Sequence, residues 1–450
     1  MEEKTLYELT PSQGVVELQC KYTLFKKVVN ILSSMTSKNE LDFSVMEVAL
    51  NKIIERNDCL RLNIVKKDKK LYQYFDEKRD YMKVPVLEFK TEKEQNNFID
   101  KLRQKPIKYL QGQMIDPYFI KTFDGKYMIF LKVCHYALDM YGISIIYKDL
   151  FEVYNALKNG AELPEQPTQF EDVVKKDLSR KNNETYKKNN HEFFKKILTE
   201  NDEPYYAGVH GPENKIWKKK LKKNRRAMKM FFIKCDTKGT IKPIDKELTQ
   251  KVINFAKENS FSPASLFLYG ATLTTAKLNK TYANILPLEL CNCRGTMNEK
   301  LCAGTKVQSV PGFTKFDKDK SFLENFEYFS QEQMKAHRHI GYSEQEFQLL
   351  LREVYKASFL ECYWSLTFSF IPYTNPDNME FDIYSNEKCA LPVYIAQLYD
   401  VNTGDIRMAY DYQTKIITEQ DIDNYHKMYL KVLEQIVDNP EIKLDDITIE

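Results

Sequence analysis

His135 and Asp139, four positions apart, are the side chains of this sequence whose types and spacing best suit catalysis. Histidine exchanges protons near neutral pH because its ordinary pKa is about 6.5. Both side chains lie in the segment 134–140, directly after the apolar run 127–133. A strand would fix the imidazole and a turn would expose it, so the pattern indicates proton transfer at the end of a strand. The spacing alone also fits a structural histidine with its own hydrogen bonds, which is the commoner case.

The elements that must hold this turn are a strand before it and a helix after it. Residues 127–133 predict the strand. From Ile143 to Leu157 the apolar residues fall on one face of a helix, which we expect to end near Gly160. The N-terminus of that helix would add backbone N–H groups and the positive end of its dipole. Asp139 could cap the helix, orient the turn or pair with a distant arginine.

The rest of the chain alternates between helical and strand-like patterns in two halves of comparable size. This alternation predicts an α/β fold with two lobes. Prolines and polar residues between the halves are typical of a connecting segment. We expect an N-terminal lobe at 1–178 with the His135 turn, a polar and basic connection at 179–230, and a C-terminal lobe at 231–450. Helices are expected at 43–57, 248–258, 264–278 (after the N-cap Ser262) and 419–437, and strands at 59–65, 71–75 and within 281–310 and 362–411.

The composition is that of a globular protein. The 450 residues are 43% hydrophobic and 29% charged, which is unlike a disordered chain. The N-terminus is acidic where a signal peptide would be basic and then apolar. Charged residues interrupt the most apolar run, 128–146, so it does not suit a bilayer. We therefore expect a cytoplasmic protein without membrane contact.

The cysteines and the net charge argue against metal and nucleic-acid binding. Nine cysteines, an odd number, indicate reduced thiols rather than a disulfide framework. The spacing of Cys291, Cys293 and Cys302 matches no common zinc motif, so we expect no metal. A net charge of only +3 gives no general reason to expect a nucleic-acid partner.

One segment is strongly basic, because residues 215–229 read KIWKKKLKKNRRAMK without an acid. A solvated linker is the ordinary role of such a run. A docking surface for an acidic or phosphorylated partner is the sharper hypothesis. DNA binding is the weakest one, because no recognition motif accompanies the run. The lysines that would form the docking surface are Lys218, Lys219, Lys220, Lys222 and Lys223.

Motif-like segments recur in order along almost the whole chain. They are Leu9-Thr10-Pro11-Ser12-Gln13, Arg56-Asn57-Asp58-Cys59-Leu60-Arg61, 134–140, Gln169-Phe170-Glu171-Asp172-Val173-Val174, Asn292-Cys293-Arg294, Gly304-Thr305-Lys306-Val307-Gln308-Ser309, and, near the C-terminus, 408–412 and 439–447. Together they resemble the condensation domains of nonribosomal peptide synthetases, within the chloramphenicol-acetyltransferase-like superfamily of CoA-dependent acyltransferases. Segment 134–140 is similar to the H-H-x-x-x-D-G signature of that family.

The resemblance implies two chloramphenicol-acetyltransferase-like lobes, arranged as a V-shaped pseudo-dimer with a tunnel between them. A donor thioester on the phosphopantetheine arm of a carrier protein would enter from one side and an amine from the other. His135 matches the catalytic histidine, which would accept the amine proton or hold the amine and the tetrahedral intermediate. Asp139 matches a structural aspartate that pairs with Arg294 across the lobes. No cofactor is required, because the thioester is already activated, and the family usually works as a monomer.

The active-site turn, with Cys134, Tyr136 and Met140, departs from the family pattern at two positions. Cys134 replaces the first histidine, where a small buried side chain is the better interpretation than a nucleophile. Met140 replaces a glycine that permits unusual backbone angles and close approach of a ligand. The methionine could narrow the tunnel, and Gly142 could restore some flexibility.

These features predict a free-standing condensation enzyme that joins a carrier-bound acyl or aminoacyl group to a small-molecule amine to form an amide. Neither an adenylation signature nor a carrier segment follows in the sequence, so the acidic carrier would act in trans, steered by the five lysines. Two alternatives stay open. One is a CoA-dependent O- or N-acyltransferase, and the other is a degenerate, non-catalytic module that binds a carrier and recruits partners.

Overall fold

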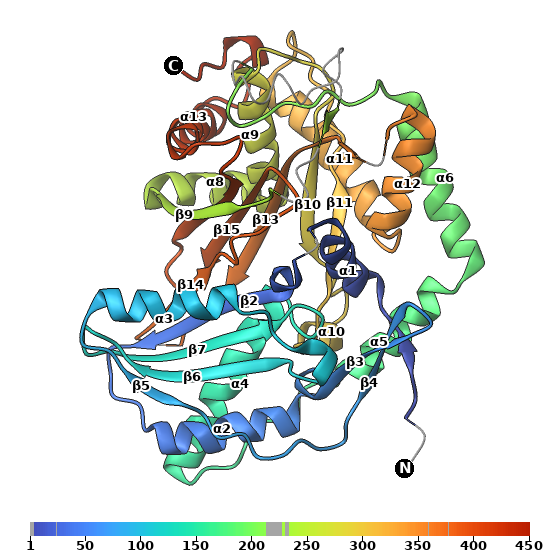
Figure 1. The fold of residues 1–450 in the computed structure, drawn as a ribbon. Helices are drawn as coiled ribbons and strands as arrows, with labels where there is room; N and C mark the ends of the chain where they lie inside the picture. The colour runs from blue at the N-terminus through green and yellow to red at the C-terminus, as the bar shows by residue number, and fades with distance from the viewer. Residues whose placement is uncertain (1–3, 24, 213–226, 230–233, 359, 377) are drawn as a thin grey trace. The chain divides into compact units, whose positions relative to one another are not determined.

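The computed structural model describes residues 4–23, 25–212, 227–229, 234–358, 360–376 and 378–450. The lysines Lys218, Lys219, Lys220, Lys222 and Lys223 lie outside the described residues. The chain forms two compact units (Figure 1). Unit 1 comprises 1–183, 292–307 and 373–386, and unit 2 comprises 184–291, 308–372 and 387–450.

Unit 1 is built on a five-stranded sheet in the order β14-β2-β7-β6-β5. The strands β14/β2, β2/β7 and β7/β6 are antiparallel, and β5 is parallel to β6. A second sheet has the order β1-β4-β3. The strands are β1 (Tyr7–Glu8), β2 (Asn30–Ser37), β3 (Leu62–Lys67), β4 (Lys70–Phe75), β5 (Val86–Glu88), β6 (Ile115–Lys121), β7 (Tyr127–Cys134) and β14 (Met379–Tyr384).

Helices cover both faces of the five-stranded sheet (Figure 1). Side chains alternate between the faces of a strand, so Met128 and Phe130 of β7 pack in a cluster with Ile99 and Leu102 of α3. On the opposite face, Tyr147 of α4 reaches the carbonyl of Ile129. The helices are α1 (Pro11–Thr23), α2 (Phe43–Arg56), α3 (Glu92–Gln104), α4 (Met140–Asn159), α5 (Phe170–Lys181) and the short α10 (Met297–Lys300), with 3-10 turns at Lys26–Val29, Asp58–Arg61 and Tyr109–Gln111.

Unit 2 contains a six-stranded sheet in the order β11-β10-β13-β15-β16-β9 and a two-stranded sheet of β12 and β8. Helices α8, α9, α11 and α13 share one hydrophobic core with the large sheet. The strands are β8 (Met228–Lys229), β9 (Thr237–Ile244), β10 (Leu286–Asn292), β11 (Val307–Pro311), β12 (Glu361–Cys362), β13 (Trp364–Tyr373), β15 (Val393–Asp400) and β16 (Ile406–Gln413); the helices are α6 (Glu184–Glu200), α8 (Lys246–Glu258), α9 (Pro263–Leu278), α11 (Phe322–Arg338), α12 (Glu344–Tyr355) and α13 (Glu419–Asp438), with a 3-10 turn at Leu444–Asp446.

The helices expected from periodicity and capping are confirmed within a few residues. Asp139 is the N-cap of α4, and Gly160 ends the helix with φ 62° in the left-handed region. Ser262 is the N-cap of α9, where it accepts from the N–H of Ser265.

Two expectations differ from the structure. The strand expected from residue 59 begins at Leu62, because the Asp58 carboxylate accepts the N–H groups of Phe170 and Glu171 and the chain makes a 3-10 turn there first. The segment expected to be a polar connection contains helix α6, which buries Phe194 and Leu198 despite its polar composition. Compared with the contiguous lobes expected from the sequence, unit 1 also includes 292–307 and 373–386.

In the part of the chain that the structure describes, no helix combines the length and apolar character needed to cross a membrane.

Candidate active site

The His135 turn is fixed by backbone hydrogen bonds at the end of β7. The His135 N–H donates to the carbonyl of Val29 at 2.8 Å, and Cys134 pairs with Asn30 of β2. The carbonyl of Cys134 accepts from the N–H groups of Ala137 and Leu138 at 2.9 and 3.1 Å. The backbone is therefore tightly held, while the His135 side chain itself is half-buried.

Two buried glutamines, Gln13 and Gln73, stabilise the turn by hydrogen bonds. The Gln13 side chain donates to the carbonyl of Tyr136 at 3.0 Å. Gln13 and Gln73 also exchange two amide hydrogen bonds, of 2.6 and 2.7 Å. Both side chains are fully buried, so each amide satisfies the other's polar groups where water is excluded.

The His135 imidazole is held in its neutral form. Burial lowers the pKa of His135, and the nearby Asp139 carboxylate and backbone groups of His135 and Leu138 only partly oppose this effect. The Nδ1 atom is buried and has no hydrogen-bond partner among the described residues. In a neutral imidazole one nitrogen carries the hydrogen and the other can accept a proton or a hydrogen bond; because Nδ1 is buried, Nε2 is the candidate acceptor.

Asp139 is saturated by hydrogen bonds. Its carboxylate accepts the N–H of Gly142 at 2.7 Å and the N–H of Lys306 at 2.6 Å. Arg294 adds two more bonds, Nη1 to Oδ2 at 3.0 Å and Nη2 to Oδ1 at 3.2 Å. Four donors to one buried carboxylate leave its oxygens fully engaged and fix its orientation. The arrangement therefore suits an orienting group rather than a proton-transfer group.

Arg294 is fixed in turn by its own segment of unit 1. Its guanidinium donates to the carbonyls of Cys302 and Gly304 and to the side chain of Asn292. The ring of Tyr141 lies 4.7 Å from the guanidinium carbon, a cation–π contact. Asp139 and Arg294 are thus paired, but not across the lobes as the family resemblance implies, because 292–307 belongs to unit 1 together with the His135 turn.

The other residues of the turn have structural surroundings. Cys134 is buried, and burial raises the pKa of its thiol to about 12, which makes it a poor nucleophile. Tyr136 is also buried, with its hydroxyl facing the sulfur of Cys20. Met140 is half-buried as the first residue of α4.

Gly142 serves close packing rather than flexibility. It lies within α4 and has no positive φ. A Cβ added there would lie 1.8 Å from the carbonyl oxygen of Ala303. The start of α4 therefore touches the backbone of the segment that carries Arg294, and the suggested role of Gly142 in restoring flexibility is wrong.

Three residues at this site escaped the sequence analysis as functional candidates. They are Gln73, which pairs with Gln13, and the buried ion pair of Lys306 with Asp177. The sequence carries no spacing signal for these partners, since they come from separate elements. The one available signal was a lysine inside an otherwise motif-like segment, 304–309.

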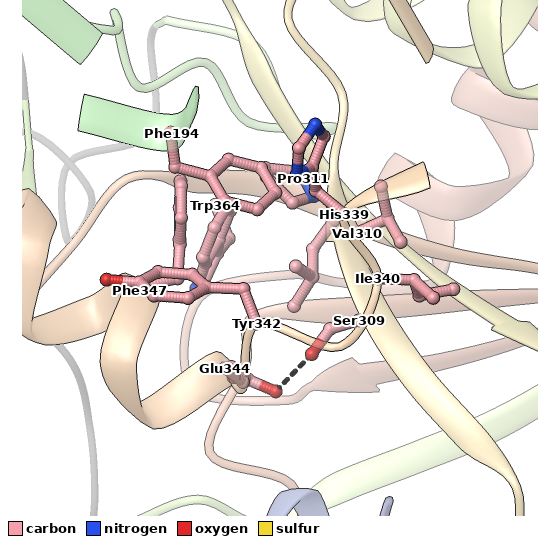
Figure 2. Close-up of a pocket in the computed structure, with 11 residues that line it drawn as sticks. Phe194, Ser309, Val310, Pro311, His339, Ile340, Tyr342, Glu344, Phe347 and Trp364 are labelled. Atoms are coloured by element: carbon pink, nitrogen blue, oxygen red, sulfur yellow. Dashed lines mark hydrogen bonds between the residues drawn. The ribbon is translucent and has the colours of Figure 1, made fainter. Parts of the chain in front are cut away.

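Unit 2 contains a small cavity of its own (Figure 2). Its volume of about 10 Å³ leaves room for one water molecule at most. Aromatic side chains and the Glu344 carboxylate line it, and Ser309 donates to that carboxylate at 2.7 Å. Burial raises the pKa of Glu344 to about 6, and the Ser309 hydrogen bond opposes this shift. The cavity is too small for a substrate.

Among the described residues, no cluster of His, Cys, Asp and Glu could hold a metal ion.

Comparisons with known proteins place this geometry in a family. A family model described as "Condensation domain" matches residues 3–449. Surfactin synthase subunit 1 of Bacillus subtilis (strain 168) is 22% identical over 475 residues, covering 99% of this chain, and a plipastatin synthase chain of the same organism is 19% identical over 445 residues, covering 98%. The chain spans only 12% and 17% of the length of these relatives.

Solved structures agree on the fold. A variant of the starter condensation domain of rhizomide synthetase, in complex with C8-CoA, matches with a TM-score of 0.80, 15% identity and coverage of 99% and 98% of the two chains. The condensation domain from Monacolin K polyketide synthase matches with a TM-score of 0.81, 14% identity and coverage of 98% and 99%. The expected chloramphenicol-acetyltransferase-like α/β fold is confirmed by these matches. The chain therefore belongs to the condensation-domain family, acyltransferases that form amide bonds from thioester-linked donors.

Proposed function

We propose that this chain transfers an acyl or aminoacyl group from the phosphopantetheine thioester of a carrier protein to a small-molecule amine. The observation that carries the proposal is the placement of the His135 imidazole, whose pKa burial lowers, on a turn whose far end is anchored by the Asp139–Arg294 pair. Preorganised groups of this kind lower the barrier of a reaction because they need not reorganise in the transition state.

In the proposed reaction, the amine nitrogen attacks the thioester carbonyl carbon. A C–N bond forms, the C–S bond breaks, and the proton lost by the amine reaches the departing thiolate. His135 accepts or orients that proton through Nε2, because Nδ1 is buried. The proposal gives Asp139 no proton-transfer role, since four donors already occupy its carboxylate.

A coenzyme A thioester is the second candidate for the donor. It is favoured by one observation, the matched starter condensation domain that was solved in complex with C8-CoA. The two donors share the pantetheine thioester, so the chemistry at His135 would be the same. Relative kcat/KM values for acyl-coenzyme A and the matching acyl carrier protein would distinguish them.

The test is incubation of the purified protein with a panel of acyl and aminoacyl pantetheine thioesters and a pool of amines and alcohols. Products are identified by mass spectrometry. We expect an amide that His135→Ala abolishes and that the control His191→Ala, a half-buried histidine of α6 in unit 2, retains. An ester as the main product would favour the O-acyltransferase alternative. Carrier binding without any product would favour the non-catalytic module.

A further inference from the structure

A second buried ion pair lies next to the Asp139–Arg294 pair. Lys306 Nζ lies 2.7 Å from Oδ1 and 2.8 Å from Oδ2 of Asp177. The side chains are only 2% and 7% exposed. Removing two charges from water is costly, and a buried pair is weak evidence for stability by itself. The burial of this pair therefore needs a reason other than its contribution to stability.

Lys306 connects this second pair directly to Asp139. Its backbone N–H is one of the four donors to the Asp139 carboxylate, at 2.6 Å. Its carbonyl accepts the N–H of Cys293 at 3.0 Å, beside Arg294. The side chain of the same residue is bound to Asp177 on α5. Any movement of Lys306 away from α5 would shift a donor of Asp139.

Helix α5 holds the Arg294 end of the same segment through the preceding residue, Lys176. Lys176 Nζ lies 2.7 Å from Glu299, which also accepts the N–H groups of Gly295 and Thr296 at 2.7 and 3.1 Å. Although burial opposes it, the Lys176 hydrogen bond, the charge of Lys306 and these N–H groups lower the pKa of Glu299 to about 2. Lys176 of α5 is thus paired with the acidic Glu299 of the segment, and its neighbour Asp177 is paired with the basic Lys306.

Close packing prevents the segment from sliding along α5. A Cβ added to Gly304 would lie 1.9 Å from the ring of Phe170, the first residue of α5. On its other side, Gly304 forms a β-bridge with Leu138 of the active-site turn. The segment 294–306 therefore lies between α5 and the turn, and it touches both.

We propose that Lys306 and Asp177 are positioning residues that set the geometry of the Asp139–Arg294 pair and, through it, of the His135 turn. Their influence on turnover rests on the proposed function. Neither side chain is assigned contact with a substrate. The ion pair holds the segment that donates to Asp139 at a fixed distance from α5.

The experiment separates positioning from stability by comparing single and double variants. Lys306→Met or Asp177→Leu alone leaves one buried charge without its partner and lowers stability. The double variant Lys306→Met with Asp177→Leu removes both charges and is expected to regain most of the stability. A structural role would restore activity along with stability. Positioning predicts that kcat of the double variant stays reduced by about 100-fold while KM changes little.

The second measurement is NMR of the histidine ring, which does not depend on turnover. The His135 signals are assigned by their loss in His135→Ala, and their titration is followed in each variant. We expect shifted His135 ring signals in the double variant and unchanged ones in Lys52→Met with Glu55→Gln, which removes an exposed pair of unit 1. Wild-type kcat together with wild-type His135 signals in the stable double variant would overturn the proposal. If the wild-type protein forms no amide, the proposed function fails, and the NMR signals still decide whether the pair positions the turn.

Discussion

Arg294 donates a hydrogen bond to each carboxylate oxygen of Asp139, Nη1 to Oδ2 at 3.0 Å and Nη2 to Oδ1 at 3.2 Å, although the two residues are 155 positions apart. The pair is almost completely buried, with side-chain exposures of 0% and 6%. It connects the N-cap residue of α4 to the segment 292–307 and so restrains the turn between β7 and α4.

Breaking the Asp139–Arg294 pair from one side should be strongly destabilising. Asp139→Ala leaves the buried guanidinium without its counter-charge, so we expect a loss of about 3–5 kcal/mol in the free energy of unfolding. Denaturant unfolding measures it. Glu55→Ala, which removes one member of the exposed Lys52–Glu55 pair, should cost less than about 1 kcal/mol. Similar losses in both variants would show that the buried pair contributes nothing special.

The pH dependence of turnover should reflect the lowered pKa of His135. The neutral imidazole is the active form, and it persists at pH values where an ordinary histidine is already protonated. The acid limb of kcat/KM should therefore lie below about pH 6.5, with activity falling only as the pH drops further. A pH–rate profile of the wild-type protein measures this limb. An acid limb at or above the ordinary histidine value contradicts the neutral, buried ring.

Gly142 should tolerate no side chain. Gly142→Ala drives a methyl group into the Ala303 carbonyl, so α4 or the Arg294 segment must shift. We expect a loss of about 1–3 kcal/mol in unfolding free energy together with reduced turnover. The matched control is Gly14→Ala in α1, where an added Cβ meets nothing within 4 Å. That change should stabilise the protein by up to about 1 kcal/mol, because alanine is the better helix former.

The glutamine pair under the turn should behave as one unit. Gln13→Leu removes the donor to the Gln73 side-chain oxygen and to the Tyr136 carbonyl in a dry environment, which should cost about 1–3 kcal/mol, although Gln73 keeps its bond to the Glu8 carbonyl. Gln73→Leu leaves the bond from Gln13 to Tyr136 in place, so it should reduce turnover less than Gln13→Leu does. A double-mutant cycle in denaturant measures the coupling between the two residues. If the stability losses of the two single variants simply add up in the double variant, Gln13 and Gln73 are not energetically coupled.

Glu344 should make stability depend on pH in unit 2. Its folded pKa of about 6 lies above the ordinary 4.5, so the folded state binds the proton more tightly than the unfolded state. The resulting stabilisation is complete below about pH 4.5 and is lost as the pH rises through about 6. Glu344→Gln should therefore raise stability by about 1–2 kcal/mol at about pH 7.5, relative to wild type, and have little effect at about pH 4. Thermal unfolding at the two pH values measures the difference, and an equal effect at both would contradict the raised pKa.

Much of the local structure was determined by the sequence itself. The helix from Pro263 to Leu278 follows its N-cap Ser262, and α4 ends at Gly160, because capping and helical periodicity depend on residues only a few positions apart. The strand before His135 and the helix after it were predictable for the same reason. The order of the family-like segments indicated the fold and the pairing of Asp139 with Arg294.

The tertiary structure alone decided which polar groups meet around the turn. Lys306 finds Asp177 across 129 positions, and Gln13 finds Gln73 across 60. Nothing in their sequence spacing points to these partners, because each contact depends on how separate helices and strands pack. The start at Leu62 of the strand expected from residue 59 was decided in the same way, since Asp58 is recruited by the N-terminus of α5. Periodicity and capping are local properties that a sequence displays directly, whereas the burial and pairing of a charge depend on which elements enclose it.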